Sequence, residues 1–337
     1  MSILVTGGAG YIGSHMVHEL VDAGEKVVVL DNLSTGFHWA VPGEAKLVVG
    51  DIGDETLVKE TARKHDVQAI IHFAGSIVVP ESVADPLGYY FNNTVKSRSL
   101  MAAAVASGVK QFIFSSTAAV YGAPEVVPVG EKANLAPMSP YGSSKLMTEI
   151  MLRDTAIAHD FRYVALRYFN VAGADPRGRT GQSTKGATHL IKVACETALG
   201  KRQAMDVFGT NYSTRDGTCI RDYIHVTDLA RAHVSALGHL RQGGGSEIFN
   251  CGYSHGFTVL EVIDAVKRVS GRTFTVNYSA RRPGDPPEIV ADSTKIRTQL
   301  GWQPRHDDLD GIVRNALEWE DRLGRLQHNS AAMALGA

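Results

Sequence analysis

Tyr141 and Lys145 stand four residues apart at the start of a predicted helix. Ser139 suits the N-cap of that helix, and Pro140 suits its first turn. Because residues four apart lie on one face of a helix, the side chains of Tyr141 and Lys145 are expected to be neighbours. A phenol titrates near about 10, so lowering its pKa by about three units takes about 4 kcal/mol of stabilisation. A neighbouring ammonium favours the phenolate. The pair could therefore remove the proton of an alcohol, although this spacing alone is common in helices.

Three hydroxyl side chains follow the apolar run 111–114, which predicts a buried strand. Thr117 is placed to hydrogen-bond a substrate oxygen as the proton of that oxygen leaves. Ser115 and Ser116 have a second interpretation, because hydroxyls at a strand end often cap the next segment. The carboxyl ends of parallel strands share one edge of a sheet, so we expect these hydroxyls at the edge where ligands bind.

A glycine-rich loop follows the first apolar run, 3–6, and opens a helical stretch, 12–23. Its sequence is GGAGYIG, from Gly7 to Gly13. One glycine allows a tight turn, one lets the backbone approach a pyrophosphate, and Gly13 lets helix and strand pack closely. The helix N-terminus then offers N–H groups to the phosphates. A loop without a ligand is the alternative, but strand, loop and helix in this order favour a dinucleotide site.

Asp31 ends the second apolar run, 27–30, where a carboxylate can bond both hydroxyls of a ribose. The carboxylate would repel a 2′-phosphate, and no arginine stands beside it, so NAD is preferred over NADP. Asp51 follows the third run and could meet an adenine amine, or equally cap a helix. Residues 73–75 end the fourth run and also fall where the dinucleotide should lie.

Short apolar runs alternate with helical stretches through the first half of the chain. Strands buried on both faces have this pattern, so we predict an α/β fold with a doubly wound parallel (Rossmann) sheet. The runs are 3–6, 27–30, 47–49, 69–73, 111–114 and 164–168. Beyond them the chain is richer in loops. We predict a Rossmann domain over 1–171 and a smaller, loop-rich second domain over 172–337, with part of 219–252 packing back on the first.

Composition excludes several classes of function. The 337 residues include 34 basic and 35 acidic side chains, for a net charge of -1. A chain so balanced has no overall field to hold nucleic acid or an acidic membrane surface, and no stretch approaches the roughly 18 apolar residues of a membrane span. The three cysteines form no C-x-x-C pair, and His15 and His18 lack a third ligand, so no metal is expected. We expect a cytoplasmic protein.

Together these motifs resemble the extended branch of the short-chain dehydrogenase/reductase superfamily, which combines a glycine loop, an aspartate, Tyr-x-x-x-Lys and strand-end hydroxyls. Further segments resemble the UDP-glucose 4-epimerase family more closely, and the similarity runs from Met1 to Trp319. These segments are DNL at 31–33, HFAG at 72–75, FSS at 114–116, VYG at 120–122, RYFN at 167–170 and RDYIHVTDL at 221–229. The resemblance implies a Rossmann domain that holds NAD and a second domain that holds a UDP-sugar.

The resemblance also implies an activity, the inversion of C4 in UDP-glucose and UDP-galactose. Tyr141 would take the proton of the 4-hydroxyl, Lys145 would tune it and contact the nicotinamide ribose, and Thr117 would hydrogen-bond the substrate. NAD would accept the hydride of C4 and return it to the other face after the 4-keto sugar has rotated. The cofactor would stay bound through each turnover.

The family implies ligand contacts at matching positions. For NAD they are Gly7, Gly10, Tyr11, Ile12, Gly13, Asp31, Asn32, Asp51, Ile52, Phe73, Ala74, Gly75, Asn93, Ser115, Tyr141, Lys145 and Tyr168. For the UDP-sugar they are Thr117, Tyr141, Asn170, Leu190, Phe208, Arg221, Arg282, Asp285 and Ile289. Arginines suit a diphosphate because a guanidinium can bind it bidentately. His189 stands where many members have asparagine and receives no role. Members typically form homodimers through helices of the cofactor domain.

Other functions stay open. One is a different nucleotide-sugar 4-epimerase, acting on UDP-N-acetylglucosamine or UDP-glucuronate. Ile289 falls where some members carry a tyrosine that narrows the space beside the C2 substituent of the sugar. A 4,6-dehydratase is disfavoured, because Ala118 and Ala119 stand where it needs acidic side chains. A non-catalytic NAD sensor is the alternative from another class, but it would have no reason to combine a proton-transfer pair with a diphosphate site.

Overall fold

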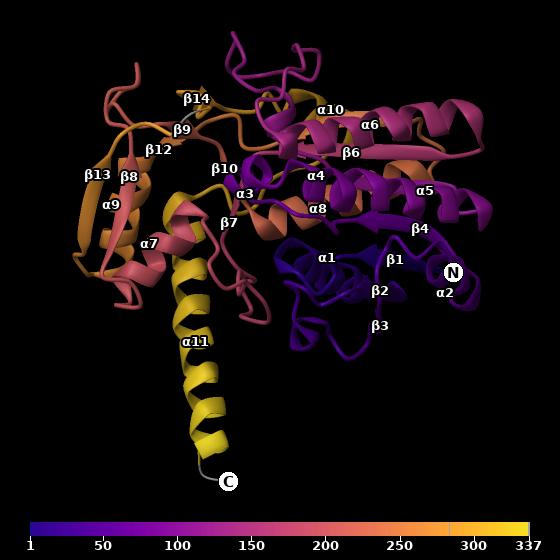
Figure 1. The fold of residues 1–337 in the computed structure, drawn as a ribbon, viewed down its shortest axis with the longest axis horizontal. Coiled ribbons are helices and arrows are strands. Elements are labelled where there is room, and N and C mark those ends of the chain that lie inside the picture. The colour runs from indigo at the N-terminus through magenta and orange to yellow at the C-terminus, as the bar shows by residue number, and fades with distance from the viewer. Residues whose placement is uncertain (283, 336–337) are drawn as a thin grey trace.

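A seven-stranded parallel sheet forms the centre of the molecule (Figure 1). The computed structural model describes residues 1–282 and 284–335, with side chains as far as 325. The strand order is β11-β6-β5-β4-β1-β2-β3, and all neighbouring strands run parallel. The strands are β1 (Ser2–Thr6), β2 (Val27–Asp31), β3 (Lys46–Val49), β4 (Val67–His72), β5 (Gln111–Ser115), β6 (Arg162–Tyr168) and β11 (Glu247–Cys251). The predicted doubly wound sheet is confirmed.

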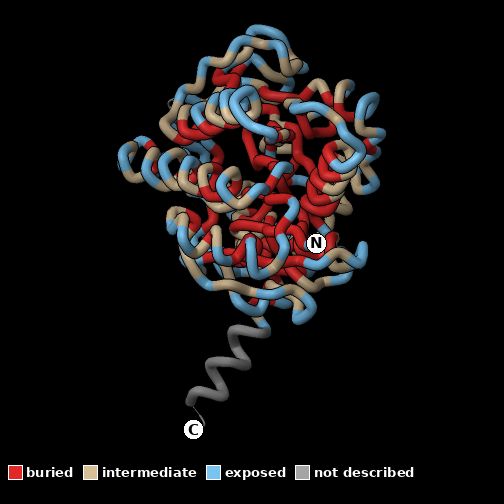
Figure 2. Tube along the Cα trace, turned by 90° about the vertical axis from the view of Figure 1, so that its right-hand side faces the viewer, coloured by how far each residue is buried: buried red, intermediate tan, exposed pale blue. Residues whose placement is uncertain are grey.

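Helices cover both faces of this sheet, because alternate residues of each strand point to opposite sides. In β1, Ile3 and Val5 join one hydrophobic core and Leu4 joins another. Helices α1 (Tyr11–Asp22) and α8 (Val226–Arg241) contribute to the first core. The second core includes residues of α2 (Glu55–Lys64), α5 (Lys96–Ala106) and α6 (Pro140–Ala158). Figure 2 shows the buried segments inside the molecule, which explains the uninterrupted apolar runs of the sequence.

The strand β11 comes from the second half of the chain. It pairs with β6 over its whole length, from Glu247 opposite Val164 to Cys251 opposite Tyr168. The preceding helix, α8, contacts α1, β5 and β6. Residues 226–251 therefore complete the sheet and one of its helical layers.

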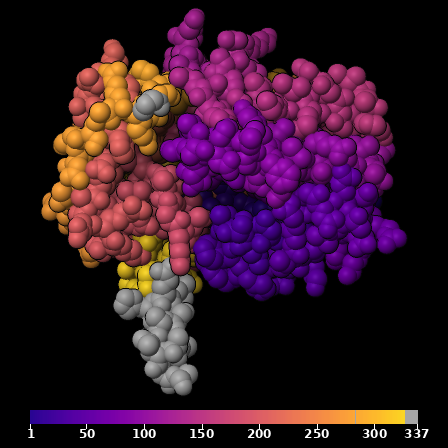
Figure 3. Space-filling view, viewed as in Figure 1, coloured from indigo at the N-terminus to yellow at the C-terminus, as the bar shows by residue number. Residues whose placement is uncertain are grey.

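The rest of the second half forms a smaller body, and Figure 3 shows a hollow between it and the sheet domain. Its sheets pair β7 (Asn170–Ala172) with β10 (Tyr223–His225), β8 (Ala204–Phe208) with β13 (Thr275–Ser279), and β9 (Ile220–Arg221) with both β12 (Phe257–Thr258) and β14 (Glu288–Ile289). Its helices are α7 (Leu190–Ala198), α9 (Val259–Ser270) and α11 (Leu309–Leu335), which pack on one another. The short helix α10 (Thr294–Leu300) instead contacts β11 and α8 of the sheet domain.

Short helical segments make the connections near the carboxyl ends of the sheet strands. They are η1 (His38–Ala40), α3 (Val79–Ala84), α4 (Pro86–Tyr90), the π-helical turn η2 (Phe91–Val95) and η3 (Ala118–Val120). Within the described ranges, no helix combines the length and the apolar character needed to cross a membrane.

Candidate active site

Tyr141 and Lys145 lie one turn apart near the start of α6, and both side chains are buried. The helix begins as the sequence predicts. The Ser139 hydroxyl accepts a hydrogen bond from the backbone N–H of Gly142 at 3.2 Å, and Pro140 occupies the first turn. Because the cap fixes the first turn, the direction of the tyrosine side chain is set by the local sequence.

The start of α6 contacts the end of β5. The Nζ of Lys145 donates to the backbone carbonyl of Ser115 at 3.1 Å and lies 5.0 Å from the centre of the Phe114 ring. The hydroxyl of Thr117 lies near enough to the Tyr141 phenol to lower its pKa. The structure thus brings the three predicted catalytic side chains together at one edge of the sheet.

Burial changes the acidity of this pair. It raises the pKa of Tyr141, because the phenolate is the charged form, while the Thr117 hydroxyl opposes that rise. Burial lowers the pKa of Lys145 to about 8, because the ammonium is its charged form. The expected drop in the pKa of Tyr141 is therefore not produced by Lys145 and Thr117 alone, and a further positive charge beside the phenol is needed.

The neighbouring hydroxyls have structural partners as well. Thr117 accepts a hydrogen bond from the backbone N–H of Ala119 at 3.1 Å and so caps η3. From the sequence, we expected capping as an alternative role of Ser115 and Ser116, whereas the structure shows it for Thr117. The Ser116 hydroxyl instead donates to Glu149 Oε1 at 2.5 Å. One lone pair of the Thr117 oxygen is used by the cap, and its hydroxyl proton stays available for a ligand or the phenol.

The glycine loop is closed by backbone on every side. Gly7 has a φ of +69°, and a Cβ there would lie 2.6 Å from the backbone nitrogen of Ala74. A Cβ on Gly13 would lie 2.1 Å from the Gly7 carbonyl oxygen. Gly10 is the N-cap of α1, whose first-turn N–H groups have no partner within the helix. This cradle of backbone donors fits the pyrophosphate of a dinucleotide.

Asp31 ends β2 as a buried carboxylate beside that loop. Its Oδ2 accepts a hydrogen bond from the backbone N–H of Ala9 at 2.9 Å, and its Oδ1 accepts one from Leu33 at 2.8 Å. Each carboxylate oxygen has a second lone pair, so the group can hold the loop and still accept from ribose hydroxyls. The sequence did not indicate the bracing contact with Ala9.

Asp51 is paired rather than free. Its Oδ2 accepts from the Nζ of Lys96 at 2.6 Å, and its Oδ1 accepts from the backbone N–H of Gly53 at 2.8 Å. Burial raises the pKa of Asp51, but these two bonds, the charge of Lys96 and a bond from Asn32 together hold that pKa below its ordinary value. The helix-cap interpretation is wrong, because Asp54 is the N-cap of α2. Asn32 lies beside Asp51, with its amide 3.4 Å from Oδ2.

The residues after β4 form the opposite wall of the predicted cofactor site. Gly75 lies close to the lysine, since a Cβ there would be 3.5 Å from the Nζ of Lys145. The side-chain amide of Asn93 binds both backbone groups of Ser76, the residue after Gly75. Its oxygen accepts from the Ser76 N–H at 2.7 Å, and its nitrogen donates to the Ser76 carbonyl at 2.9 Å. Asn93 therefore shapes this wall, with both ends of its amide bound to protein.

The remaining predicted cofactor residues also have protein contacts. The hydroxyl of Tyr168 meets that of Ser115. The hydroxyl of Tyr11 donates to the Gly173 carbonyl at 2.7 Å. Ile52 is buried in the second core, and Phe73, Ala74 and Ile12 pack at the edges of the two cores. These residues stand at or just after the carboxyl ends of β1, β3, β4, β5 and β6.

Four predicted UDP-sugar residues form a separate cluster. Asp285 accepts from the Nε of Arg282 at 2.9 Å and lies 3.7 Å from the Nη2 of Arg221. The Arg282 guanidinium lies 4.8 Å from the centre of the Phe208 ring. The two cations, one carboxylate and one exposed aromatic ring offer partners for a diphosphate, a ribose and a base.

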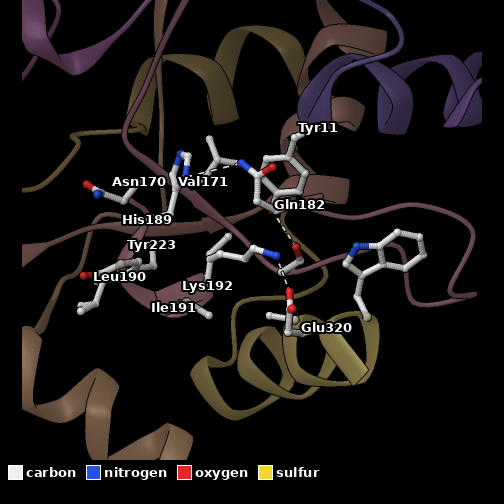
Figure 4. Close-up of a pocket in the computed structure, with 14 residues that line it drawn as sticks. Tyr11, Asn170, Val171, Gln182, His189, Leu190, Ile191, Lys192, Tyr223 and Glu320 are labelled. Carbon is white, nitrogen blue, oxygen red and sulfur yellow. Dashed lines mark hydrogen bonds and ion pairs between the residues drawn. The ribbon is translucent and has the colours of Figure 1, made fainter. Parts of the chain in front are cut away.

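Asn170 and Leu190 line a pocket between α1, β7, α7 and α11 (Figure 4). Tyr11 lies at its upper edge, and the ring of His189 meets the Tyr11 ring edge-on, with centroids 6.5 Å apart. The sequence did not indicate several other lining side chains, among them Gln182, Lys192, Tyr223, Trp319 and Glu320. They come from loops and helices distant in the chain, so no local pattern could have identified them.

Ile289 connects the two clusters. In β14 it pairs with Arg221 of β9. Its buried side chain belongs to a hydrophobic cluster with Ala118, which follows Thr117, and with Phe169, which precedes the pocket residue Asn170. The residue therefore stands between the catalytic strand end and the predicted diphosphate arginines.

Among the described residues, no group of three or more His, Cys, Asp or Glu side chains could hold a metal ion. The buried cysteines Cys195, Cys219 and Cys251 are free thiols.

Comparisons with known proteins agree with this chemistry. The model of the NAD dependent epimerase/dehydratase family matches residues 3–252. A UDP-glucose 4-epimerase of Azospirillum brasilense is 60% identical over 321 residues, which cover 95% of this chain and 92% of that protein. A UDP-glucose 4-epimerase from Brucella ovis, solved with NAD, is 46% identical, with a TM-score of 0.92 and coverage of 95% and 98%. A UDP-Glc/GlcNAc 4-epimerase from Campylobacter jejuni is 47% identical, with a TM-score of 0.84 and coverage of 95% and 99%.

Proposed function

The chain belongs to the NAD dependent epimerase/dehydratase family, and we propose that it interconverts UDP-glucose and UDP-galactose by inverting C4, with NAD as its cofactor. One observation carries the proposal for the site. The start of α6 meets the end of β5, so that Tyr141, Lys145 and Thr117 converge beside the glycine loop. This is the set of groups that reversible oxidation of a secondary alcohol needs.

The side chains have distinct roles in this reaction. NAD, when bound, supplies the oxidation by taking the C4 hydrogen with its electrons and giving it back. Tyr141 takes the proton of the 4-hydroxyl, and Thr117 holds the same oxygen through its hydroxyl. The Lys145 ammonium, fixed on the Ser115 carbonyl, favours the phenolate and hydrogen-bonds a ribose. The buried phenol needs a further positive charge, which the oxidised nicotinamide of NAD would supply when bound.

The nucleotide end of the substrate must stay anchored while the sugar turns. Arg221 and Arg282 offer two guanidinium groups to the diphosphate, and Asp285, between them, offers a carboxylate to the uridine ribose. Phe208 offers an exposed ring to the base. Asn170 and Leu190, which line the pocket beside α1, would complete the contacts with the diphosphate and uridine.

The direct test is turnover. Purified protein mixed with UDP-galactose should form UDP-glucose until equilibrium is reached, without added NAD, because the cofactor is regenerated in each cycle. Absence of turnover by protein that carries NAD would contradict the epimerase and favour an NAD sensor. Formation of a 4-keto-6-deoxy sugar would indicate a dehydratase, which Ala118 and Ala119 disfavour since their methyl groups transfer no protons.

Asp31 determines the choice of cofactor. The protein should release NAD rather than NADP on denaturation, because a buried carboxylate at the end of β2 repels a 2′-phosphate. Asp31→Ala should bind NAD more weakly, since it loses the ribose acceptor and the bond that Ala9 donates. The same variant should not gain NADP binding, because residues 32–37 provide no basic group. Dinucleotide released by heat and separated by chromatography measures this, and mainly NADP would contradict the assignment.

Ile289 sets the width of the sugar pocket. A phenol ring at this position would narrow the space beside the C2 substituent, whereas isoleucine leaves room for an N-acetyl group. We expect the wild-type protein to epimerise UDP-N-acetylgalactosamine as well as UDP-galactose. Ile289→Tyr should lower kcat/KM for the acetylated sugar by about 10–200-fold relative to UDP-galactose. A wild type that does not epimerise the acetylated sugar, or a variant that accepts both sugars equally well, would mean that position 289 does not control access of the C2 substituent.

A homodimer forms through the helices beside α6. Large apolar side chains are exposed on α3, α4 and η2, which contact α6, and on α6 itself; they include Val83, Leu87, Phe91, Ile150 and Ile157. A surface of this kind is typical of an interface, and a second copy of the chain is the occupant that the family indicates. Leu87→Asp should shift the mass measured by light scattering from dimer to monomer. Val126→Asp, at a side chain that is 74% exposed in a loop, is the control that should leave the mass unchanged. A monomeric wild type would contradict the dimer.

A further inference from the structure

Glu149 is a buried carboxylate on the catalytic helix with no part in the reaction described above. It lies one turn beyond Lys145 and two turns beyond Tyr141 on α6. Its partner is Arg167 of β6, and the two side chains are 3% and 2% exposed. A buried ion pair is by itself weak evidence of stabilisation, so its geometry has to be considered.

The geometry of this pair is closely determined. The Nε of Arg167 donates to Oε1 of Glu149 at 2.9 Å, and its Nη2 donates to Oε2 at 2.6 Å. The remaining Nη1 donates to the Tyr121 hydroxyl at 3.0 Å and to the Glu131 carbonyl at 3.3 Å. Two parallel bonds fix the plane of the carboxylate, and the bonds behind them prevent the guanidinium from turning away.

Glu149 extends the contact of α6 with β5 by one turn. Three successive turns of the helix each meet one residue of the segment 115–117. These pairs are Tyr141 with Thr117, Lys145 with the Ser115 carbonyl, and Glu149 with the Ser116 hydroxyl. The first two pairs belong to the active site, whereas the third is held from behind by Arg167.

We propose that Glu149, held by Arg167 and bonded to Ser116, is a positioning residue that fixes the register of α6 against the end of β5. The inference rests on the proposed role of Tyr141 as the base. Any slide or rotation of α6 would carry the phenol away from the 4-hydroxyl, and a misplacement of about 1 Å can slow a reaction about 100-fold. The contact between Glu149 and Ser116 lies on the same helix face as the reacting groups, so it opposes these motions.

Ser116→Ala tests the role without leaving a charge unpaired. It removes one hydroxyl and leaves the ion pair of Glu149 and Arg167 intact. We expect kcat to fall about tenfold, with KM for UDP-galactose and the amount of bound NAD unchanged. Ser2→Ala is the matched control, because it removes a buried hydroxyl that donates to the His65 carbonyl at 2.7 Å at the opposite end of the sheet. It should lower the melting temperature to a similar extent and leave kcat unchanged.

The double variant Glu149→Met with Arg167→Met removes both charges together, so that neither remains buried and unpaired. It should fold and retain NAD, with kcat lowered about 100-fold and KM within a factor of about two. A wild-type kcat in either variant would overturn the positioning role. The same holds if the loss of activity is fully explained by a smaller fraction of protein that is folded and carries NAD. An inactive wild type would instead contradict the proposed function.

Discussion

Replacement of Tyr141 by phenylalanine is expected to lower kcat for UDP-galactose at least about 100-fold, as the loss of a general base does. The substitution removes one oxygen and leaves the buried ring in its place on α6. Lys145 donates to the Ser115 carbonyl and Thr117 carries only a neutral hydroxyl, so neither of these two neighbours replaces the phenol as a base. Initial rates of UDP-glucose formation measure the loss. Dinucleotide released by denaturation should equal that of the wild type.

Two variants complete this experiment. Tyr163→Phe removes another buried phenol oxygen, near the amino end of β6 and away from the site, and should keep the wild-type kcat. Lys145→Ala should lose activity and also hold NAD more weakly, because the ammonium serves both the phenol and the cofactor. If Tyr141→Phe kept more than about a tenth of the wild-type kcat, Tyr141 would not be the base.

The sequence predicted the parts of the molecule that depend on neighbouring residues. A strand such as β1, buried on both faces, needs a continuous apolar run, and this run is visible without a structure. The turn after it needs glycine where φ is positive, as at Gly7. The start of α6 needs a cap, which Ser139 provides. Each of these constraints acts within about one turn or one strand, so local patterns contain it.

Contacts between distant segments could not be predicted in this way. Asp51, in the loop after β3, pairs with Lys96 at the start of α5, and nothing at either position indicates the partner. The same holds for Glu149 and Arg167. The spacing of Glu149 from Lys145 equals that of Lys145 from Tyr141, and this repeat is the one sequence signal that could have indicated it. The positions of such pairs follow from how helices pack on the sheet, which depends on the whole fold.

The strand β11 illustrates the same limit. Residues 247–251 contain a short apolar segment after the glycine run 243–245, and neither feature indicates which strand it pairs with. Their place in the main sheet follows from pairing with β6, about 80 residues earlier in the chain, which no local rule specifies. The substrate cluster has the same origin, because Phe208, Arg221 and Arg282 come from three separate segments. Only the resemblance to a family grouped them in advance.

Gly13→Ala is expected to yield a protein with about 5- to 150-fold weaker NAD binding, corresponding to the roughly 1–3 kcal/mol that overpacking costs. The added methyl would stand 2.1 Å from the carbonyl oxygen of Gly7. That oxygen cannot retreat, because the N–H of Gly7 donates to the Leu30 carbonyl at 2.9 Å and its Cα lies against the backbone of Ala74. The first turn of α1 must move instead, and its N–H groups then leave the position that the pyrophosphate requires.

The NAD content of the purified protein and the rise in its melting temperature on adding NAD measure this effect. Gly43→Ala is the matched control, because its backbone φ is not positive and a Cβ there would meet nothing within 4 Å. It should keep the wild-type content of NAD. Activity of Gly13→Ala should return in part at high NAD concentration, since the catalytic groups on α6 and β5 are untouched. Full NAD content and wild-type activity in Gly13→Ala would mean that the pyrophosphate does not lie on this loop, and the cofactor would then have to bind elsewhere along the edge of the sheet.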